Sequence, residues 1–357
     1  MGYVTGLLGL AFAIALVVHD GWHAVYAAID RAGWVLLWLL PFHFLPLALD
    51  VFGWRVLLSP RDPRRRAAIP VLFWIATVRE AVNRLLPVAS IGGEVVGVRL
   101  LKWRGIDGAA ATASVIIEVL VTIVGQYLFT ALGLVLLIGS TAHTGVLGMA
   151  LAALALSLPV PVVLVVLVRH GGMFARLQAL GRRWLTGRAA RVAELMNGHQ
   201  LDREIRVLYA RHVRVFAAGG WQFGGFVVGS FESWLILRML GHPIGVVDTI
   251  ALEAVTQTLR QMIFIVPAGL GVQEGSLVLM GSIIGLPADL SVALALVKRM
   301  REVVFGVPAL VSWQWAEMHR LRRQRCVDAR PGSSNPDTSG MESRCREATD
   351  VQRPRNP

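Results

Sequence analysis

The amino-acid sequence predicts an all-α, polytopic membrane protein with two inverted-topology halves, each containing a broken, re-entrant helix pair. Three observations lead to this prediction. The chain has 357 residues, is 55% hydrophobic and has a mean hydropathy of +0.59. Apolar runs with few charges, such as 34–49, 146–168 and 250–266, are near the length of membrane-spanning helices. Segments that interrupt such helices recur in corresponding parts of the chain.

Basic residues lie in short stretches that alternate with nearly uncharged connections. The formal net charge is +12, and Lys and Arg are concentrated in residues 55–66, 99–104, 169–214 and 320–330. By the positive-inside rule, we expect these stretches and the C-terminus on the cytoplasmic side of a bacterial inner membrane. The charge therefore indicates topology and contact with anionic lipid at the basic cytoplasmic surface, and it argues against nucleic-acid binding.

The first half is expected to cover residues 1–168. In order we expect a helix at about 3–18 that is retained and not cleaved as a signal peptide, a helix at 34–58, a re-entrant pair at about 70–101, and helices at 109–138 and 145–168. The basic stretches on either side of the re-entrant pair must lie on the same side of the membrane. The chain between them therefore crosses an even number of times.

Residues 169–214 carry ten arginines against three acidic residues. We expect a basic amphipathic linker here that lies on the cytoplasmic membrane surface. The second half, residues 215–315, is predicted to contain a helix at 215–240, a re-entrant pair at about 246–286 and a helix at 290–315. Residues 316–357 are expected to form a disordered cytoplasmic tail.

Each re-entrant pair is broken at a proline that is followed by glycines and a glutamate. Pro87 and Pro267 are 180 residues apart, and so are Glu94 and Glu274, each of which follows its proline by seven residues. Broken backbone at membrane depth occurs where it is buried or lines a cavity. The break residues are therefore predicted to shape a site near the membrane midplane: Pro87, Gly92, Gly93, Pro267, Gly269 and Gly271.

Charged residues inside the expected spanning segments are candidate substrate-binding residues, because inserting each costs about 2.5–3.5 kcal/mol. Near the first break, Arg79 with Asn83 and Glu80 with Arg84 have i,i+4 spacing and could partly neutralise one another. The cluster is either an internal ion-pair network or a polar wall that faces a lipid headgroup.

Glu94 and Glu274 follow the breaks, near the N-termini of the returning half-helices. A carboxylate at this position can cap exposed N–H groups and is favoured by the helix dipole. The alternative is a protonatable or substrate-contacting pair, and the sequence leaves both interpretations open.

The remaining candidates lie in later helices: Glu118, Glu253, Arg260, Lys298, Arg299, Arg301 and Glu302. The last four place an excess of positive charge inside one expected span. This excess indicates either an anionic ligand or ion pairing with lone acids such as Glu118 and Glu232.

No cofactor or metal site is expected, and no catalytic residues are assigned. The nine histidines lack zinc-ligand spacing, both cysteines lie in the polar tail, and no phosphate-binding glycine loop is present.

Two stretches, VREAVNRLLPVASIGGEVVGVRLL and IVPAGLGVQEGSLVLMGSIIGLP, resemble the paired signatures of the flippase-like membrane domain of lysylphosphatidylglycerol synthases. The acid in ASVIIEVL and the run LALVKRMREVVFG extend this likeness over most of residues 1–315. The residues of PVASIGGEVV and VPAGLGVQEG look most like those of the branch associated with hopanoid biosynthesis. The residues in the signature regions are Arg84, Pro87, Gly93, Glu94, Glu118, Pro267, Gly271, Glu274, Arg299, Arg301 and Glu302.

The resemblance implies a membrane domain that moves an aminoacylated phospholipid across the bilayer. It does not carry over the synthase activity, because only some forty largely polar residues follow Trp315. We therefore expect a non-enzymatic lipid translocator, for a hopanoid or an associated polar lipid. The alternatives are a scaffold for lipid-biosynthesis enzymes and an intramembrane lipid transferase with Glu94 or Glu274 as the acid–base group.

Overall fold

The computed structural model describes residues 35–86, 92–140, 148, 155, 158–170, 172–184, 198–262 and 271–328. Within these residues every regular element is a helix, which confirms the all-α prediction. Several predicted features lie outside the described residues: the helix at 3–18, the break residues Pro87, Pro267 and Gly269, and the last part of the tail.

The helices of the two halves can be set side by side in the same order, and the two helices of each broken pair match in length. The first half contains α3 (Val35–Leu58), the short 3-10 helix η1 (Ser59–Arg61), α4 (Ile69–Leu85), α5 (Gly92–Trp103) and α6 (Gly108–Ser140). The second contains α12 (His212–Met239), α13 (Val246–Met262), α14 (Val272–Ile283) and α15 (Ala288–Asp328). Both α4 and α13 have 17 residues, and both α5 and α14 have 12. Between the halves lie α8 (Pro159–His170), α9 (Met173–Trp184) and α11 (Gly198–Ala210).

The short helix of each broken pair also ends in the same kind of turn. Gly105 and Gly285 have φ values of 78° and 79°, a left-handed conformation that favours glycine. The next amide, of Ile106 or Leu286, donates to the carbonyl five residues earlier, at 3.3 and 2.8 Å respectively. This is the Schellman arrangement, and it turns the chain into the long helix that follows.

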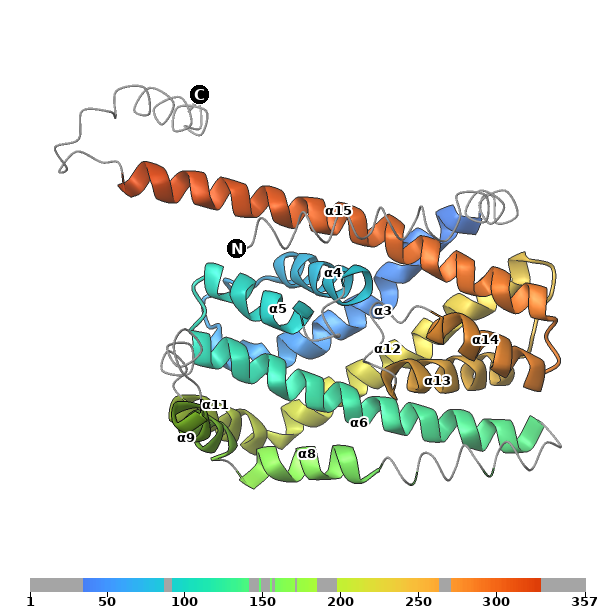
Figure 1. The fold of residues 1–357 in the computed structure, drawn as a ribbon, viewed down its shortest axis with the longest axis horizontal. Coiled ribbons are helices and arrows are strands. Elements are labelled where there is room, and N and C mark those ends of the chain that lie inside the picture. Colours follow the sequence, from blue (N-terminus) through green and yellow to red (C-terminus); the bar gives the residue numbers. More distant parts are fainter. Residues whose placement is uncertain are drawn as a thin grey trace.

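Contacts between the halves are reciprocal. Helix α3 packs against its counterpart α12, α4 packs against α15, and α13 packs against α6. Figure 1 shows that α6 and α15 run in opposite directions, with α4 and α5 toward one end and α13 and α14 toward the other. The inverted topology of the two halves, and their orientation relative to a membrane, stay predictions.

Small residues bring α3 and α12 close together. A Cβ atom added to Gly53 would lie 3.2 Å from the carbonyl oxygen of Ala218, and one added to Gly225 would lie 3.5 Å from that of Pro46. Close backbone approach through small residues is typical of helix packing in membranes, where burial of apolar surface gives little driving force.

Two apolar clusters support the two broken pairs. The first joins α3, α4, α5 and α15 and includes Trp54, Leu72 and Leu101. The second joins helices α12, α13, α14 and α15 and includes Leu252 and Leu277. Each broken pair is therefore held by its own apolar packing. Helix α15, which carries several of the charged residues, contributes to both clusters.

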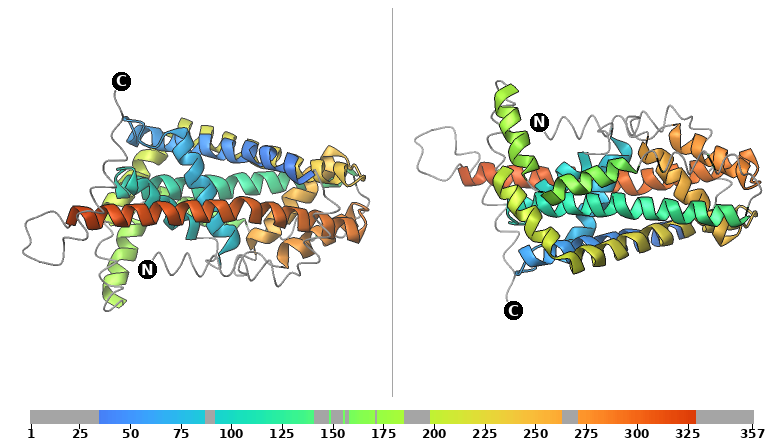
Figure 2. Two further views of the ribbon diagram at one scale, coloured as in Figure 1. Left: turned by 90° about the horizontal axis from the view of Figure 1, so that it is seen from above. Right: turned by 90° about the horizontal axis from the view of Figure 1, so that it is seen from below.

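The basic stretches meet at one end of the bundle. Arg61 pairs with Glu204 of α11 at 2.7 Å, and Arg66 donates to the carbonyl oxygen of Gly105 at 2.9 Å. The guanidinium of Arg320 lies 4.6 Å from the ring centre of Trp103. Helices α9 and α11 run across the bundle at this same end (Figure 2). The stretches expected on one side of the membrane are thus neighbours in the fold.

The linker differs from its prediction in one respect. The apolar face of α11, with Leu201, Ile205 and Leu208, is buried in a cluster with residues of α6 and α8. Asp202 of α11 also accepts from the amide of Ala175 in α9 at 2.9 Å. The apolar face of α11 is therefore covered by protein, and contact of the linker with the membrane surface stays a prediction.

The tail also begins later than predicted. Helix α15 continues to Asp328, through residues expected to be disordered from 316 onward. Glu317 is buried and pairs with Arg99 of α5, so a tertiary contact supports this part of the helix.

Among the described residues, two helices are long and apolar enough to cross a membrane by length and composition, Trp38–Arg61 and Gly108–Leu137. The sequence predicts further spans. Helix α15 is longer than either of these, and it carries Lys298, Arg299, Arg301 and Glu302 in its first half.

Gly93 should be intolerant of any side chain. A Cβ atom there would lie 2.7 Å from Nδ2 of Asn83 and would collide with the backbone of Arg79. We expect Gly93→Ala to lower stability by about 1–3 kcal/mol through overpacking. The matched control is Gly275→Ala, whose Cβ would meet nothing within 4 Å. It should raise stability by about 0.5–1 kcal/mol, because alanine favours helix. Thermal unfolding in detergent distinguishes the two, and equal stability would contradict the close packing at the first break.

Candidate functional site

The first broken pair surrounds the side chain of Arg79, in the middle of α4. Its guanidinium donates to both carboxylate oxygens of Glu118 on α6, at 2.9 and 2.8 Å, and also bonds Glu94 on α5. It lies 4.6 Å from the ring centre of Trp54 on α3. A buried guanidinium that donates to carboxylates on two other helices is held in orientation as well as neutralised. Arg79 therefore joins four helices of the first half.

The direct contacts of the polar residues of α4 go to other helices and not to their i,i+4 neighbours. Asn83 does not serve Arg79; it accepts from the amide of Gly93 at 2.8 Å and donates to Glu94 at 3.3 Å. Glu80 pairs with His43 of α3 at 3.1 Å, and Arg84 faces Glu302 of α15 at 3.7 Å. Partners on other helices replace the local ones, because α4 is packed between α3, α5 and α15.

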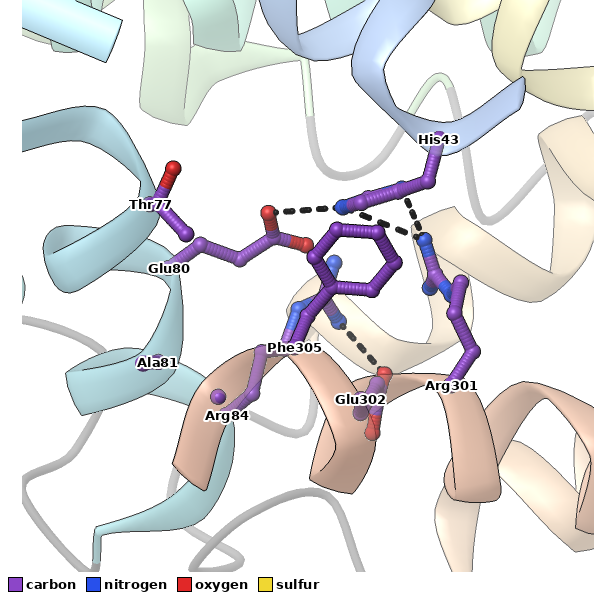
Figure 3. Close-up of a pocket in the computed structure, with 9 residues that line it drawn as sticks. His43, Thr77, Glu80, Ala81, Arg84, Arg301, Glu302 and Phe305 are labelled. Atoms are coloured by element: carbon purple, nitrogen blue, oxygen red, sulfur yellow. Dashed lines mark hydrogen bonds and ion pairs between the residues drawn. The ribbon is translucent and has the colours of Figure 1, made fainter. Parts of the chain in front are cut away.

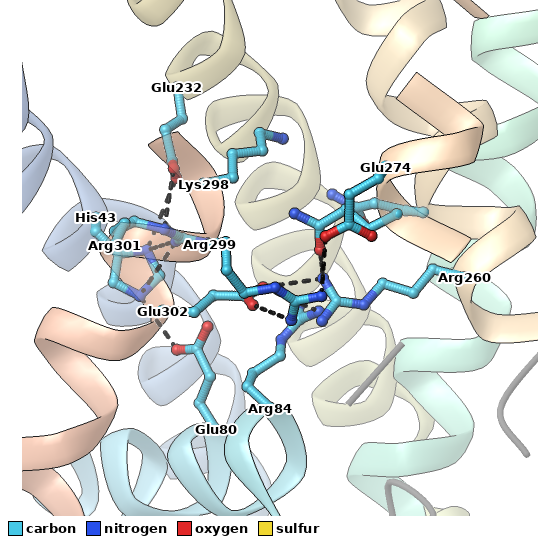
Figure 4. Close-up of polar contacts among 12 residues, drawn as sticks. His43, Glu80, Arg84, Glu232, Arg260, Glu274, Lys298, Arg299, Arg301 and Glu302 are labelled. Carbon is cyan, nitrogen blue, oxygen red and sulfur yellow. Dashed lines mark hydrogen bonds and ion pairs between the residues drawn. The ribbon is translucent and has the colours of Figure 1, made fainter. Parts of the chain in front are cut away.

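Glu302 connects the two broken pairs, as Figure 4 shows. One carboxylate oxygen lies 2.9 Å from Arg260 of α13 and 3.7 Å from Arg84 of α4, and the other lies 3.1 Å from Arg299. Only 1% of its side chain is exposed. Burying a carboxylate this deeply is tolerable because several cations and hydrogen bonds compensate it.

The second broken pair contributes partners to the same network. Glu274 of α14 pairs with Arg299 at 3.1 Å, and Gln273 accepts from Arg260. Glu94 and Glu274, which sequence reasoning paired across the two halves, thus each bind an arginine. Both also lie in the first turn of their helices, where the dipole favours an acid.

Lys298 belongs to a separate contact in the second half. Its Nζ atom lies 2.5 Å from Glu253 of α13, which also accepts from Ser233 at 2.7 Å and from Gln257 at 3.0 Å. Lys298 follows Glu118 by 180 residues, so equivalent positions on α15 and α6 carry opposite charges. Each of them pairs with the longer helix of its own broken pair.

The predicted excess of positive charge on the last span is neutralised. Lys298 pairs with Glu253, Arg299 with Glu302 and Glu274, and Arg301 with Glu232 at 3.0 Å. Glu232 is one of the two lone acids that the sequence offered as partners for α15, whereas the other, Glu118, pairs with Arg79 instead. The sequence did not assign Glu253 or Glu274 to α15. The basic residues of the network are therefore held in ion pairs and do not form a purely cationic site.

His43 was not among the residues that the sequence singled out. A single histidine on an apolar helix carries no sequence signal, yet His43 contacts Glu80, Glu232 and Arg301 from three other helices. A small pocket beside it, with room for little more than a water molecule, is lined by Thr77, Glu80, Ala81, Arg84, Arg301, Glu302, Phe305 and Gly306 (Figure 3).

A second missed group is uncharged and lies where α6 meets α13. The hydroxyls of Thr130 and Thr258 are 2.5 Å apart, and Gln261 donates to the side chain of Gln126 at 3.2 Å. These residues extend polar contact between the halves beyond the ion pairs.

Exposure varies across the network. The side chains of Arg84, Glu274, Glu80 and Glu94 are 34%, 32%, 27% and 23% exposed, whereas that of Glu302 is 1% exposed. The first four can therefore meet a ligand that enters from outside the bundle, and Glu302 lies behind them. Within the described ranges, no cluster of His, Cys, Asp and Glu has the arrangement of a metal site.

A family model described as the lysylphosphatidylglycerol synthase TM region matches residues 4–309 of this chain. No curated protein and no solved structure gave a match. The family match confirms the resemblance seen in the paired stretches, and the narrower hopanoid-biosynthesis branch stays a prediction.

Proposed function

The chain belongs to the lysylphosphatidylglycerol synthase transmembrane-region family, and from that premise we propose that it moves a polar-headed lipid between the leaflets of a bacterial inner membrane. The family makes it a membrane protein related to lipid synthesis or transport. Translocation is a more specific role than the family match gives, and the ion-pair network between the two halves supports it.

The observation that carries the proposal is the position of Glu302. Through Arg84 and Arg260 it connects α4 of the first broken pair with α13 of the second. A buried ion pair gains little net free energy, because the desolvation penalty nearly cancels the attraction. A headgroup with charges or hydrogen-bonding groups can therefore replace one partner at small cost. Exchange of this kind would loosen one inter-half contact while the headgroup occupies it.

The partly exposed members of the network provide places for the headgroup to enter. Arg84 and Glu80 lie on α4, and Glu94 and Glu274 begin the short returning helices. In transporters with inverted repeats, sites at discontinuous helices are exposed alternately as one half rocks against the other. The reciprocal packing of α4 on α15 and of α13 on α6 suits such a motion.

The end of the bundle that gathers the basic stretches would face the cytoplasm, by the positive-inside rule. Its arginines would contact anionic lipid, at roughly 1 kcal/mol for each charge near the membrane surface. A hopanoid or an associated polar lipid is the substrate we propose, and enzymes that make such lipids are possible neighbours at this surface.

Leaflet-resolved lipid analysis tests the proposal against its rivals. In cells from which the gene is deleted, we expect one lipid class to be retained in the leaflet where it is made, with its total amount unchanged. Loss of a lipid species from both leaflets would instead identify a transferase.

An unchanged distribution in the deletion strain would contradict translocation. The matched complementation uses Arg84→Gln and Arg64→Gln, since Arg84 belongs to the network and Arg64 is exposed at the basic end. Arg64→Gln should restore the distribution and Arg84→Gln should not.

A further inference from the structure

We propose that His43 is a proton-binding site that couples lipid movement to the proton gradient. The inference rests on the proposed translocation and adds its driving ion. The His43 cluster comprises His43 on α3, Glu80 on α4, Glu232 on α12 and Arg301 on α15. It joins helices of both halves and lies beside the pocket shown in Figure 3.

The contacts of the imidazole suggest which of its nitrogens carries hydrogen. Nε2 lies 3.1 Å from a carboxylate oxygen of Glu80, so this nitrogen carries a hydrogen and donates it. Nδ1 faces the Nη1 atom of Arg301, which can only donate, so Nδ1 must offer its lone pair. These contacts fit neutral His43 with its hydrogen on Nε2, which is the state from which the proposed proton binding starts.

A second proton on His43 would break this arrangement. Nδ1–H cannot accept from Arg301, and the two cations would repel each other. A carboxylate oxygen of Glu232 lies 3.8 Å from Nδ1 and could accept the new hydrogen after a small movement. Arg301 already pairs with Glu232 at 3.0 Å, so protonated His43 and Arg301 would compete for the same carboxylate.

That competition links the proton to the inter-half network. Arg301 is adjacent in sequence to Glu302, which holds Arg84 and Arg260. A proton that displaces Arg301 from His43 would therefore act directly beside the residue that carries the inter-half contacts. Two alternative sets of partners, selected by one proton, are what a bistable switch requires.

The residues around His43 give the proton a path from water. They also include the charged groups that act on the imidazole. Glu80 is 27% exposed and lines the pocket, so a proton can reach His43 from water through this carboxylate. The α6 acid Glu118 is held by Arg79 at 2.8 Å. The other charges that face the site are Glu80 and Arg84 from α4, Glu232 from α12, and Lys298, Arg301 and Glu302 from α15.

The test compares wild-type protein with His43→Gln in proteoliposomes that contain a lumenal pH dye and headgroup-labelled lipids. Glutamine can donate to Glu80 and accept from Arg301, so this variant fixes the neutral contacts. The control is His212→Gln, at an exposed histidine at the start of α12. With the membrane potential clamped, one proton per lipid would shift the steady-state leaflet ratio about tenfold per pH unit.

We expect wild type and His212→Gln to respond to the gradient and to change lumenal pH in step with lipid movement. His43→Gln should lose both responses while remaining folded. A gradient response retained by His43→Gln would overturn the inference, and so would wild-type translocation that ignores the gradient. The second result would leave lipid transport itself standing.

If wild type moves no lipid, the proposed function fails and a spectroscopic measurement still decides the proton site. Nitrogen-15 NMR of labelled imidazoles, with His43 assigned by its absence in His43→Gln, reports the tautomer directly. We expect the neutral form with hydrogen on Nε2 at about pH 8 and the doubly protonated form toward about pH 5. An imidazole that stays neutral throughout this range in folded protein would refute proton binding.

Discussion

Replacing Glu302 with glutamine is expected to lower the stability of the protein by about 3–5 kcal/mol, because it leaves buried cations without their carboxylate. Arg84, Arg260 and Arg299 all depend on this side chain, which is 1% exposed. Thermal unfolding in detergent measures the loss.

The control for Glu302→Gln is Glu204→Gln, which removes the partner of Arg61 at the basic end of the bundle. That pair is partly exposed, so its loss should cost less than about 1 kcal/mol. If both variants unfold at the same temperature, Glu302 does not hold the two broken pairs together in the way its contacts indicate.

Arg79→Gln is expected to have an effect of similar size in the first half. It strands Glu118 and Glu94, two acids that the same guanidinium holds. A loss of about 3–5 kcal/mol follows from leaving a buried charge uncompensated. The double variant Arg79→Gln/Glu118→Gln removes both members of the bidentate pair, and we expect it to be more stable than Arg79→Gln alone.

A double-mutant cycle of unfolding free energies measures this coupling. Additive losses in the cycle would show that Arg79 and Glu118 act independently, contrary to the 2.8 and 2.9 Å contacts between them. Arg64→Gln serves as the control, since Arg64 is exposed and should change stability little.

The broken pairs could be anticipated from the sequence because their cause is local. Proline and glycine interrupt a helix wherever they stand, and the spacing of Pro87, Pro267, Glu94 and Glu274 shows the repeat directly. The structure adds that α5 begins at Gly92 and that Gly271, with φ of 74°, directly precedes α14.

Apart from Glu232, which was named as a partner for α15 and pairs with Arg301, the partners of the charged residues could not be anticipated, because tertiary packing decides them. The i,i+4 spacing favours an ion pair between Glu80 and Arg84, yet in the fold Glu80 contacts His43. The two carboxylates that neutralise α15 from α13 and α14, Glu253 and Glu274, lie 45 and 25 residues from their partners. Local pairing contributes only about 0.2–0.5 kcal/mol, so better buried geometry on another helix prevails.

The cover of the apolar face of α11 could not be predicted from the sequence for a related reason. An apolar stripe predicts that one face of a helix is buried, but it does not indicate whether protein or lipid covers that face. Leu201 and Ile205 pack in a cluster with residues of α6, where the sequence alone favoured a membrane surface.

The most direct test of the central claim is lipid translocation by purified protein in proteoliposomes without nucleotide, followed with headgroup-labelled lipids. We predict that wild type exceeds the rate of protein-free vesicles. Arg84→Gln should fall to that background rate while keeping its unfolding temperature, because the 3.7 Å pair of Arg84 with Glu302 is long and partly exposed. Wild type that moves every tested lipid no faster than protein-free vesicles would contradict the account.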